Sequence, residues 1–437
     1  KHEDTIAVAA EVACTAFEQA QELPDPLDQA VSAQFVTPPP IEVVQESEAA
    51  TRDLYAEMWA TVTDDPHARA GVLLFCFAAF FLLGALQALY GPAFPLFRAR
   101  FDLALDEVSA VVSAQFLGAF ASIAAAGLLI RLFGYQRLLV AGAASMAAGM
   151  LGVALAPAWW LLLACAFVAG VGFGLLNVTF NLLVALVYRP NAAPALNLVS
   201  AVFGVGAVVG PLLVAVSEPR YGVPFLLLSG ATVVVLVLVA RLRVPPVSTP
   251  AARTEPTAWG QVGAFVLFYF LYVSIEGGVA AWETEHLAPV FGATTAASFT
   301  SLYWGALTVG RFLAAPLSAR VRPARMVLGA SAGALLFLAL AHYVHAAPYM
   351  YALVGLCIAP IFGTGLAWLT QAFPERAEQV TPIVMAAANL GPVVTAPLIG
   401  LAVARVGTGL VPTALTLLGV LLLTVVGGLY RRTAGRA

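Results

Sequence analysis

Residues 159–187 read WWLLLACAFVAGVGFGLLNVTFNLLVALV and contain no charged side chain. An α-helix rises about 1.5 Å per residue, so a helix of this length exceeds the roughly 30 Å thickness of the hydrocarbon core of a bilayer. In lipid the backbone must satisfy its own hydrogen bonds, which a continuous apolar run does by forming a helix. The segment therefore predicts a transmembrane helix.

The rest of the chain repeats this pattern after residue 70. Of its 437 residues, 61% are apolar and 10% are charged, whereas soluble domains carry about 25% charged residues. Twelve apolar segments are long enough to cross a bilayer, over residues 70–97, 107–130, 136–156, 159–187, 195–217, 223–242, 260–286, 295–318, 325–344, 349–372, 380–404 and 409–430. We therefore predict an all-α membrane protein with twelve transmembrane helices.

Residues 1–67 differ in composition from this apolar body. They hold fourteen acidic side chains against two basic ones, Lys1 and Arg52. No basic start followed by an apolar core is present, so the stretch does not read as a signal peptide. We predict an acidic soluble arm that is partly helical or disordered.

The membrane body divides into two sets of six helices. Residues 244–258 form the only connection rich in Pro, Thr and Ser, and they predict a cytoplasmic linker between residues 68–243 and residues 259–437. A weak internal repeat supports the division, because residues 118–139 resemble residues 305–327. Two pseudo-symmetric six-helix bundles with a binding site between them are a known transporter architecture.

Arginine placement predicts the orientation of the chain. Cytoplasmic connections are enriched in Lys and Arg. With the amino terminus inside, thirteen Arg residues fall in the cytoplasm, namely Arg131, Arg137, Arg189, Arg241, Arg243, Arg253, Arg320, Arg322, Arg325, Arg376, Arg431, Arg432 and Arg436. Only Arg98, Arg100, Arg220 and Arg405 fall outside. We therefore expect both termini in the cytoplasm and the protein in the plasma membrane, the inner membrane if the source is bacterial.

The sequence lacks the motifs that indicate several other classes of function. The four Cys residues are far apart, which disfavours a disulfide framework or a metal site. No HExxH, GxSxG or GxxxxGK[ST] motif occurs, so neither an enzyme nor direct ATP drive is indicated. The Arg residues form no continuous patch that would suit nucleic acid. We predict no cofactor, no metal and a monomeric transporter.

Glu276 is the sharpest candidate for chemistry, because a carboxyl inside a span usually faces a cavity or a partner. We interpret it as the proton-coupling or ligand-binding carboxylate, with a structural ion pair or hydrogen bond as the alternative. Glu283 and Glu285 lie toward the outer end of the same span, where we expect water to reach them. Arg311 also lies within a span and is expected to hold an acidic partner, to stabilise a gate or to snorkel.

Amide and aromatic side chains supply the remaining candidates. Asn177 and Asn181 are four residues apart, which puts both carboxamides on one helix face. Amides donate and accept hydrogen bonds to hydroxyl-rich ligands, although Asn also bonds between packed membrane helices. Further polar or aromatic residues at mid-membrane depth are Gln87, Tyr90, Gln115, Tyr269, Tyr272, Trp282, Trp304, Trp368 and Asn389. This inventory suits a neutral polar solute.

Residues 127–137, GLLIRLFGYQR, resemble the loop signature of the major facilitator superfamily, with Arg131 in place of the usual acidic residue. In that family the loop acts as a cytoplasmic latch, so the resemblance implies a gating role for Arg131. A narrower resemblance, to the fucose-permease-type sugar transporters, covers roughly residues 70–430. Its motifs are Asn177 to Asn181, Leu196-Asn197, residues 204–211, Tyr272 to Glu276 with Trp282, residues 303–311, residues 359–362, and residues 389–397. Gly91 and Asn177 stand where fucose permease carries acidic residues.

The resemblance implies a secondary transporter that moves a sugar or related small polar metabolite by alternating access, with protons as the coupling ion. The alternative is a proton-antiport exporter of drugs or amphipathic metabolites. That alternative is suggested by the pattern Gly206-x-x-x-Gly210-Pro211, which also serves close helix packing.

Overall fold

The computed structural model describes residues 66–188, 192–241, 259–318, 320–373 and 376–433, all within one compact unit. Every regular element in these ranges is helical, which confirms the all-α prediction for the described part. The predicted linker and the predicted arm up to residue 65 lie outside the described residues.

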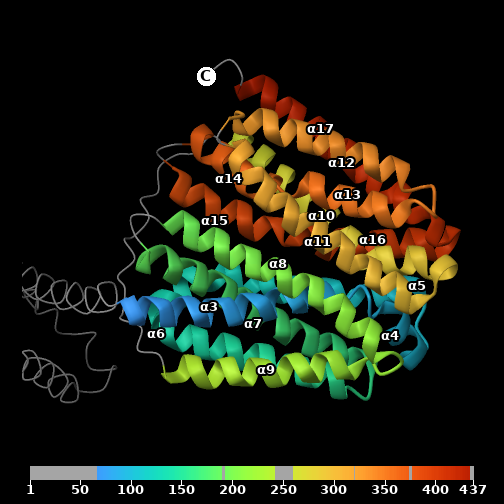
Figure 1. The fold of residues 1–437 in the computed structure, drawn as a ribbon, viewed down its shortest axis with the longest axis horizontal. Coiled ribbons are helices and arrows are strands. Elements are labelled where there is room, and N and C mark those ends of the chain that lie inside the picture. Colours follow the sequence, from blue (N-terminus) through green and yellow to red (C-terminus); the bar gives the residue numbers. More distant parts are fainter. Residues whose placement is uncertain (1–65, 189–191, 242–258, 319, 374–375, 434–437) are drawn as a thin grey trace, which may run out of the picture. The chain divides into compact units, whose positions relative to one another are not determined.

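The first half of the described chain holds seven helices (Figure 1): α3 (Pro66–Leu89), α4 (Phe94–Phe101), α5 (Leu105–Val108), α6 (Ala110–Leu155), α7 (Trp159–Val187), α8 (Ala192–Ser217) and α9 (Gly222–Arg241). The axes of α3 and α4 differ by 59°. The break falls at Gly91 and Pro92, and proline cannot continue the hydrogen-bond ladder of a helix. The span predicted over 70–97 is therefore a broken helix.

The 46-residue α6 is two crossings joined by a reversal at Gly134. Gly134 has φ 75° and ψ 166°, a conformation that is essentially confined to glycine. Gly118, before the reversal, packs on residues 167 and 171 of α7, and Gly149, after it, packs on residues 165 and 169. The two parts of α6 thus lie at the same level of α7. The separate spans predicted over 107–130 and 136–156 agree with this hairpin.

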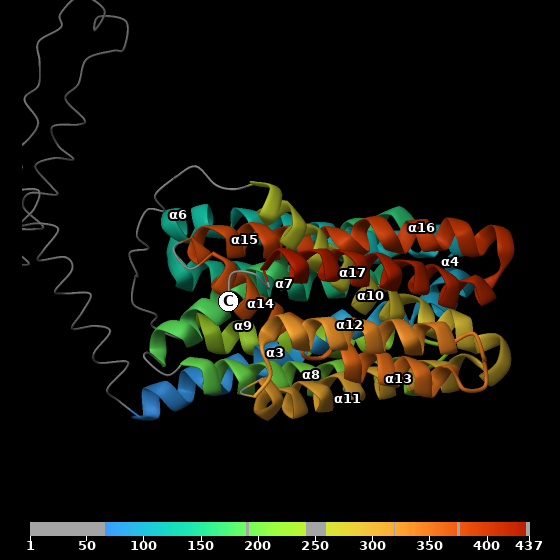
Figure 2. The ribbon, with the colours of Figure 1, turned by 90° about the horizontal axis from the view of Figure 1, so that it is seen from above.

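The second half of the described chain holds α10 (Trp259–Phe291), α11 (Ala293–Ser318), α12 (Pro323–Leu340), α13 (Ala347–Ile358), α14 (Ile361–Ala372), α15 (Ala377–Ala388), α16 (Leu390–Val406), a 3₁₀ turn (Thr408–Leu410) and α17 (Val411–Thr433). The helices of both halves run lengthwise beside one another in the view of Figure 2. Residues 347–372 and 380–406 each act as one span despite a short interruption.

Nine helices in the described residues are long and apolar enough to cross a membrane, or ten if the bent α3–α4 pair counts as one span. Two features explain why this number is smaller than the twelve predicted spans. The α6 hairpin is counted once although it crosses twice, and the 26-residue α11 carries Arg311 with several Ser and Thr residues, which lower its hydropathy. With both included, the twelve predicted spans each match a helical segment.

The two halves meet where α8 packs on α11, α5 and α6 pack on α16, and α4 approaches α10. Small residues allow these close approaches. A Cβ atom on Gly91 would lie 1.9 Å from the backbone oxygen of Ala280, and one on Gly204 would lie 2.2 Å from the hydroxyl of Thr308. Glycine at both positions lets helices of the two halves touch.

Candidate functional site

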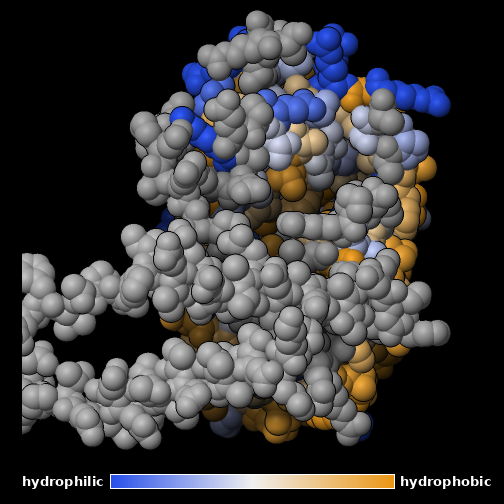
Figure 3. Space-filling view, turned by 90° about the vertical axis from the view of Figure 1, so that its left-hand side faces the viewer, coloured by the Kyte–Doolittle hydropathy of each residue, from blue (hydrophilic) through white to orange (hydrophobic). Residues whose placement is uncertain are grey.

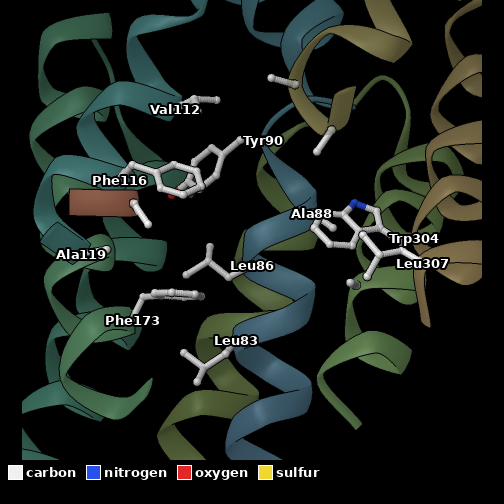
Figure 4. Close-up of a cluster of buried hydrophobic side chains, with 14 of the residues drawn as sticks. Leu83, Leu86, Ala88, Tyr90, Val112, Phe116, Ala119, Phe173, Trp304 and Leu307 are labelled. Atoms are coloured by element: carbon white, nitrogen blue, oxygen red, sulfur yellow. The ribbon is translucent and has the colours of Figure 1, made fainter. Parts of the chain in front are cut away.

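A small pocket lies between the two halves. It is lined from the first half by Gln87, Tyr90, Gly91, Val112, Gln115 and Phe116 and from the second half by Gly277, Ala280 and Ala281. In this conformation it has room for about one water molecule. Figure 4 shows Tyr90 and Phe116 side by side between α3 and α6, above the apolar packing of Leu86 and Phe173. The pocket thus brings a few polar side chains together within a mostly apolar interface between the halves.

Three polar atoms at this pocket are buried without a hydrogen-bond partner in the described residues: Oε1 of Gln87, the hydroxyl of Tyr90 and Nε2 of Gln115. Leaving a buried donor or acceptor unpaired costs about 1–3 kcal/mol. Unpaired groups of both kinds that converge on one cavity suit a ligand rich in hydroxyl groups. Gln87 and Gln115 were among the predicted binding residues, and the structure brings them together.

Trp282 lies one residue beyond the pocket on α10. Its side chain is fully buried, its ring packs edge-on against Phe94 at 5.5 Å, and its Nε1 has no hydrogen-bond partner among the described residues. Trp304 is equally buried and its Nε1 is likewise unpaired. Figure 4 places Trp304 across α3 from Tyr90 and Phe116, so it is not among the residues that line the pocket in this conformation.

Glu276 stands beside the pocket, immediately before Gly277. The hydroxyl of Tyr272 donates a hydrogen bond to the Glu276 carboxylate, and the hydroxyl of Tyr303 donates to its backbone oxygen at 3.1 Å. The guanidinium of Arg311 lies within electrostatic reach of both tyrosines. Glu276 remains partly exposed. The structure thus gathers Tyr272, Glu276 and Arg311, three predicted residues, into one cluster.

The other predicted residues lie apart from the pocket. Nδ2 of Asn181 donates to Oδ1 of Asn177 at 2.8 Å, so the two amides pair on one face of α7 as expected from their spacing. Nδ2 of Asn389 donates to the backbone oxygen of Met385 at 2.9 Å, at the junction of α15 and α16. Arg131 is exposed near the α6 reversal. None of these four lines the pocket in this conformation.

The expectation that water reaches Glu283 and Glu285 was wrong for this conformation. Their exposed fractions are 0% and 4%. Packing of α10 against α4, α11 and α13 covers this part of the helix. Glu285 forms an ion pair of 3.1 Å with Arg98 of the other half, whereas neither carboxylate oxygen of Glu283 has a hydrogen-bond partner among the described residues.

A spacing in the sequence could have indicated the burial of Glu283. Glu283 follows Glu276 by seven residues, or two helical turns, so both carboxyl groups lie on one face of α10. The position of Glu283 near the end of its predicted span suggested contact with water. Its burial depends instead on which face of the helix carries the side chain. Sequence gave no comparable signal for Arg98 as the partner of Glu285, because the two lie 187 residues apart.

Several contacts between the halves lie at the end of the helices that carries α4, α5 and the last turns of α10 and α16, which we call the α4 end. The Arg98–Glu285 pair is one of these contacts, and deeper in the interface the hydroxyl of Ser113 donates to the backbone oxygen of Val393 at 3.0 Å. A Cβ on Gly400 would lie 3.0 Å from the hydroxyl of Ser109. The halves are therefore closed against each other at the α4 end.

Figure 3 looks onto the opposite end of the helices. Hydrophilic side chains gather there over the second half of the chain. Arginines contribute to this patch, since Arg320, Arg322, Arg325, Arg431 and Arg432 at the ends of α11, α12 and α17 are all exposed. This end thus carries a group of exposed arginines.

Comparison with known proteins gives three kinds of match. A family model described as Major Facilitator Superfamily matches residues 76–358. The glucose/mannose transporter GlcP of Bacillus subtilis (strain 168) is 25% identical over 352 residues, which covers 76% of this chain and 87% of the relative.

Among solved structures, a D-xylose-proton symporter superposes with a TM-score of 0.68 at 15% identity, covering 82% of this chain and 96% of that one. The E. coli fucose:proton symporter FucP superposes with a TM-score of 0.58 at 16% identity, covering 82% and 98%. At these identities the two structures establish the fold alone.

Proposed function

Because the chain belongs to the major facilitator superfamily and is a membrane transporter, not an enzyme, we propose that it moves a sugar or related small polar metabolite by proton-coupled alternating access. The observation that carries this proposal is the set of three unpaired polar atoms on Gln87, Tyr90 and Gln115 at one pocket between the halves. The printed function of the Bacillus subtilis relative, glucose/mannose transport, supports the sugar class.

Recognition of a sugar at this pocket follows from the groups that are present. Each glutamine amide offers one acceptor and two donors, and the Tyr90 hydroxyl offers one donor and an acceptor. Sugar hydroxyl groups are donors and acceptors, so they satisfy all three. Phe116 offers an apolar face for the C–H surface of the ring, and Trp282 is proposed to add a second one when the pocket enlarges. No buried cation lies among the residues that line the pocket, which fits an uncharged solute.

Alternating access requires the pocket to enlarge and open at each end in turn. We place the α4 end outside and the arginine-rich end in the cytoplasm, with both termini inside and the protein in the plasma (bacterial inner) membrane. The Arg98–Glu285 pair and the Gly91–Ala280 contact then close the outer end. When the halves part, Asn177, Asn181, Trp304 and Asn389 join the solute path, and Arg131 and Arg311 act at the inner gate. We propose that one monomer performs this cycle.

Glu276 is proposed as the carboxylate that couples solute and proton. It lies next to Gly277 of the pocket, is partly exposed, and accepts a hydrogen bond from Tyr272. Protonation removes the charge of Glu276 and thereby weakens the hydrogen bond from Tyr272, because hydrogen bonds to charged acceptors are the stronger ones. A group at the edge of the pocket can thus respond to both ligands.

The glycine pattern that suggested an exporter has a packing explanation. A Cβ on Gly206 would lie 1.9 Å from the backbone oxygen of Phe81, and one on Gly210 would lie 2.6 Å from that of Ala85. Both glycines therefore permit α8 to lie against α3, and the pattern does not favour export.

Sugar binding to the purified protein tests the proposal. We expect calorimetric titration to detect binding of a hexose or pentose, and Gln115→Leu to weaken it about tenfold or more, because a deleted hydrogen-bonding partner costs about 1–3 kcal/mol. Gln371→Leu is the matched control, since Gln371 is exposed on α14. Absence of binding across hexoses, pentoses and polyols, or equal losses in the two variants, would contradict the proposed site.

A further inference from the structure

The Glu283 carboxyl group is buried inside the second half of the chain, away from the solute pocket lining. Its side chain is 0% exposed, and both of its oxygens lack a hydrogen-bond partner among the described residues. The Thr300 hydroxyl, which is paired at 3.0 Å with the hydroxyl of Thr284, lies near enough to influence the Glu283 carboxyl, but it carries no charge that could balance a carboxylate. An ionised carboxylate without a partner is too costly to bury, so a carboxyl group in this place binds a proton.

Titratable groups connect this carboxyl to the α4 end. Tyr351 of α13 lies within electrostatic reach of Glu283, and its hydroxyl pairs with Nδ1 of His286 at 2.9 Å. His286 is only 6% exposed and lies within reach of His342, which is exposed on the turn after α12. A series of titratable groups therefore leads from the surface toward the buried carboxyl.

A second connection leads from Glu283 toward the solute pocket. Tyr303 of α11 lies within electrostatic reach of both Glu283 and Glu276, and it donates a hydrogen bond to the backbone oxygen of Glu276. Tyr303 thus lies between the buried carboxyl and the one at the edge of the pocket. Seven residues on α10 separate these carboxyl groups.

Other charged groups around Glu283 are accounted for. On α10 itself, Glu285 is held by Arg98 of α4. From α11, Arg311 lies within reach of Tyr303. Among the described residues no Lys or Arg makes an ion pair with Glu283. Its neighbours from α11 and α13 are instead the hydroxyl groups of Thr300, Tyr303 and Tyr351.

We propose that Glu283 is a proton-binding site of the transport cycle, loaded from the α4 end through His286 and Tyr351 and linked by Tyr303 to Glu276. In the loading step, Nε2 of His286 takes up a proton from the α4 end while its Nδ1–H group gives its proton to the Tyr351 oxygen, and Tyr351 passes its own hydroxyl proton to the Glu283 carboxylate. The step ends with neutral His286, neutral Tyr351 and the Glu283 acid. No hydrogen bond joins Tyr351 to Glu283 within the described residues, so a turn of the Glu283 side chain or an intervening water completes the path.

This route has a functional consequence. It runs inside the second half of the chain, whereas the solute passes between the halves. A proton can therefore enter from the α4 end while the Arg98–Glu285 pair keeps that end closed to the solute. The inference rests on the proposed transport function.

Glu283→Gln in proteoliposomes tests the role of the carboxyl in coupling, because Gln keeps the shape but binds no proton. We expect exchange of labelled sugar across the bilayer without a gradient to persist, and accumulation driven by a proton gradient to fall about tenfold or more. Accumulation at the level of the unaltered protein would overturn the inference. Failure of the unaltered protein to exchange any sugar would instead overturn the proposed function.

Two further measurements separate a proton site from a structural residue. In infrared spectra of the purified protein at neutral pH, we expect a band from a protonated carboxyl group that is absent in Glu283→Gln, which requires no substrate. We also expect Tyr351→Phe to slow proton-driven accumulation about tenfold, and Tyr349→Phe to leave it unchanged, since Tyr349 is exposed on the same helix. Identical spectra, or equal behaviour of the two tyrosine variants, would overturn the inference.

Discussion

At the scale of single residues, the Arg98–Glu285 pair is the strongest electrostatic link between the halves among the described residues. Glu285 is 5% exposed in its side chain and Arg98 is 33% exposed, so the carboxylate loses most of its hydration in the closed state. Truncating one partner of a buried pair is strongly destabilising because it leaves a charge uncompensated. Removing one partner of the pair should therefore destabilise the closed conformation.

We predict that Arg98→Ala opens the α4 end. A buried, unpaired Glu285 disfavours closure, so the open conformation gains population. Labelling of a cysteine introduced at Ser109, which lies in this closed interface, should become about tenfold faster. Arg98→Ala combined with Glu285→Gln should restore slow labelling, because the unpaired charge is removed. Unchanged labelling in Arg98→Ala would contradict the role of the pair.

Gly91 offers a second test at the residue scale. Alanine there would bring a Cβ atom to 1.9 Å from the Ala280 backbone, so α10 must move away. We predict that Gly91→Ala also favours the open α4 end and slows sugar exchange, because the closed state becomes strained. Gly230→Ala on α9 is the control, since nothing lies within 4 Å of its Cβ position. Normal exchange by Gly91→Ala would show that the contact does not govern closure.

At the scale of elements, α6 depends on one glycine. The backbone of Gly134 has a conformation that costs other residues about 1–3 kcal/mol. We predict that Gly134→Ala lowers the thermal unfolding temperature in detergent, whereas Gly127→Ala, in a helical segment of the same element, leaves it equal or higher. A larger loss of stability in Gly127→Ala would contradict the account of the reversal.

Much of the element structure was accessible from sequence. Runs such as 159–187 predict helices because lipid permits few alternatives, and residues 127–137 indicated both the α6 reversal and the family. The break between α3 and α4 was missed, because Gly91-Pro92 stands inside an apolar run whose length alone suggested one straight span. The burial of Glu283 was missed for a related reason. Hydropathy along the chain describes depth in the membrane, but only packing decides which helix face is covered.

The composition of the pocket was likewise only partly predictable from the sequence. Gln87 and Gln115 were predicted as polar residues at mid-membrane depth, and they meet in the structure because α3 and α6 both approach α10. Asn177 and Asn181 have the same chemistry, yet they pair with each other on α7. Sequence spacing relates residues on one helix, whereas convergence of three helices is a tertiary property.

At the scale of the whole molecule, we propose that the two halves move against each other and that α10 links solute binding, proton binding and closure. It carries Gly277 and Ala280 at the pocket, Glu276 beside it, Glu283 in the interior and Glu285 at the α4 end. Motion of one helix therefore changes the surroundings of all three carboxyl groups at once.

Glu276→Gln should differ from Glu283→Gln in its effect on the solute. Glu276 adjoins the pocket and accepts a hydrogen bond from Tyr272, so its replacement should weaken sugar binding as well as coupling. Glu283 lies outside the pocket lining, so its replacement should spare binding. Calorimetric titration of both variants makes the comparison, and equal affinities would contradict the assigned positions of the two carboxyl groups.

The most direct test of the central claim is uptake of labelled sugar into proteoliposomes under an imposed proton gradient. The account predicts accumulation above the external concentration for at least one hexose or pentose, abolished when a protonophore collapses the gradient. Expulsion of hydrophobic dyes with no sugar accumulation would contradict it.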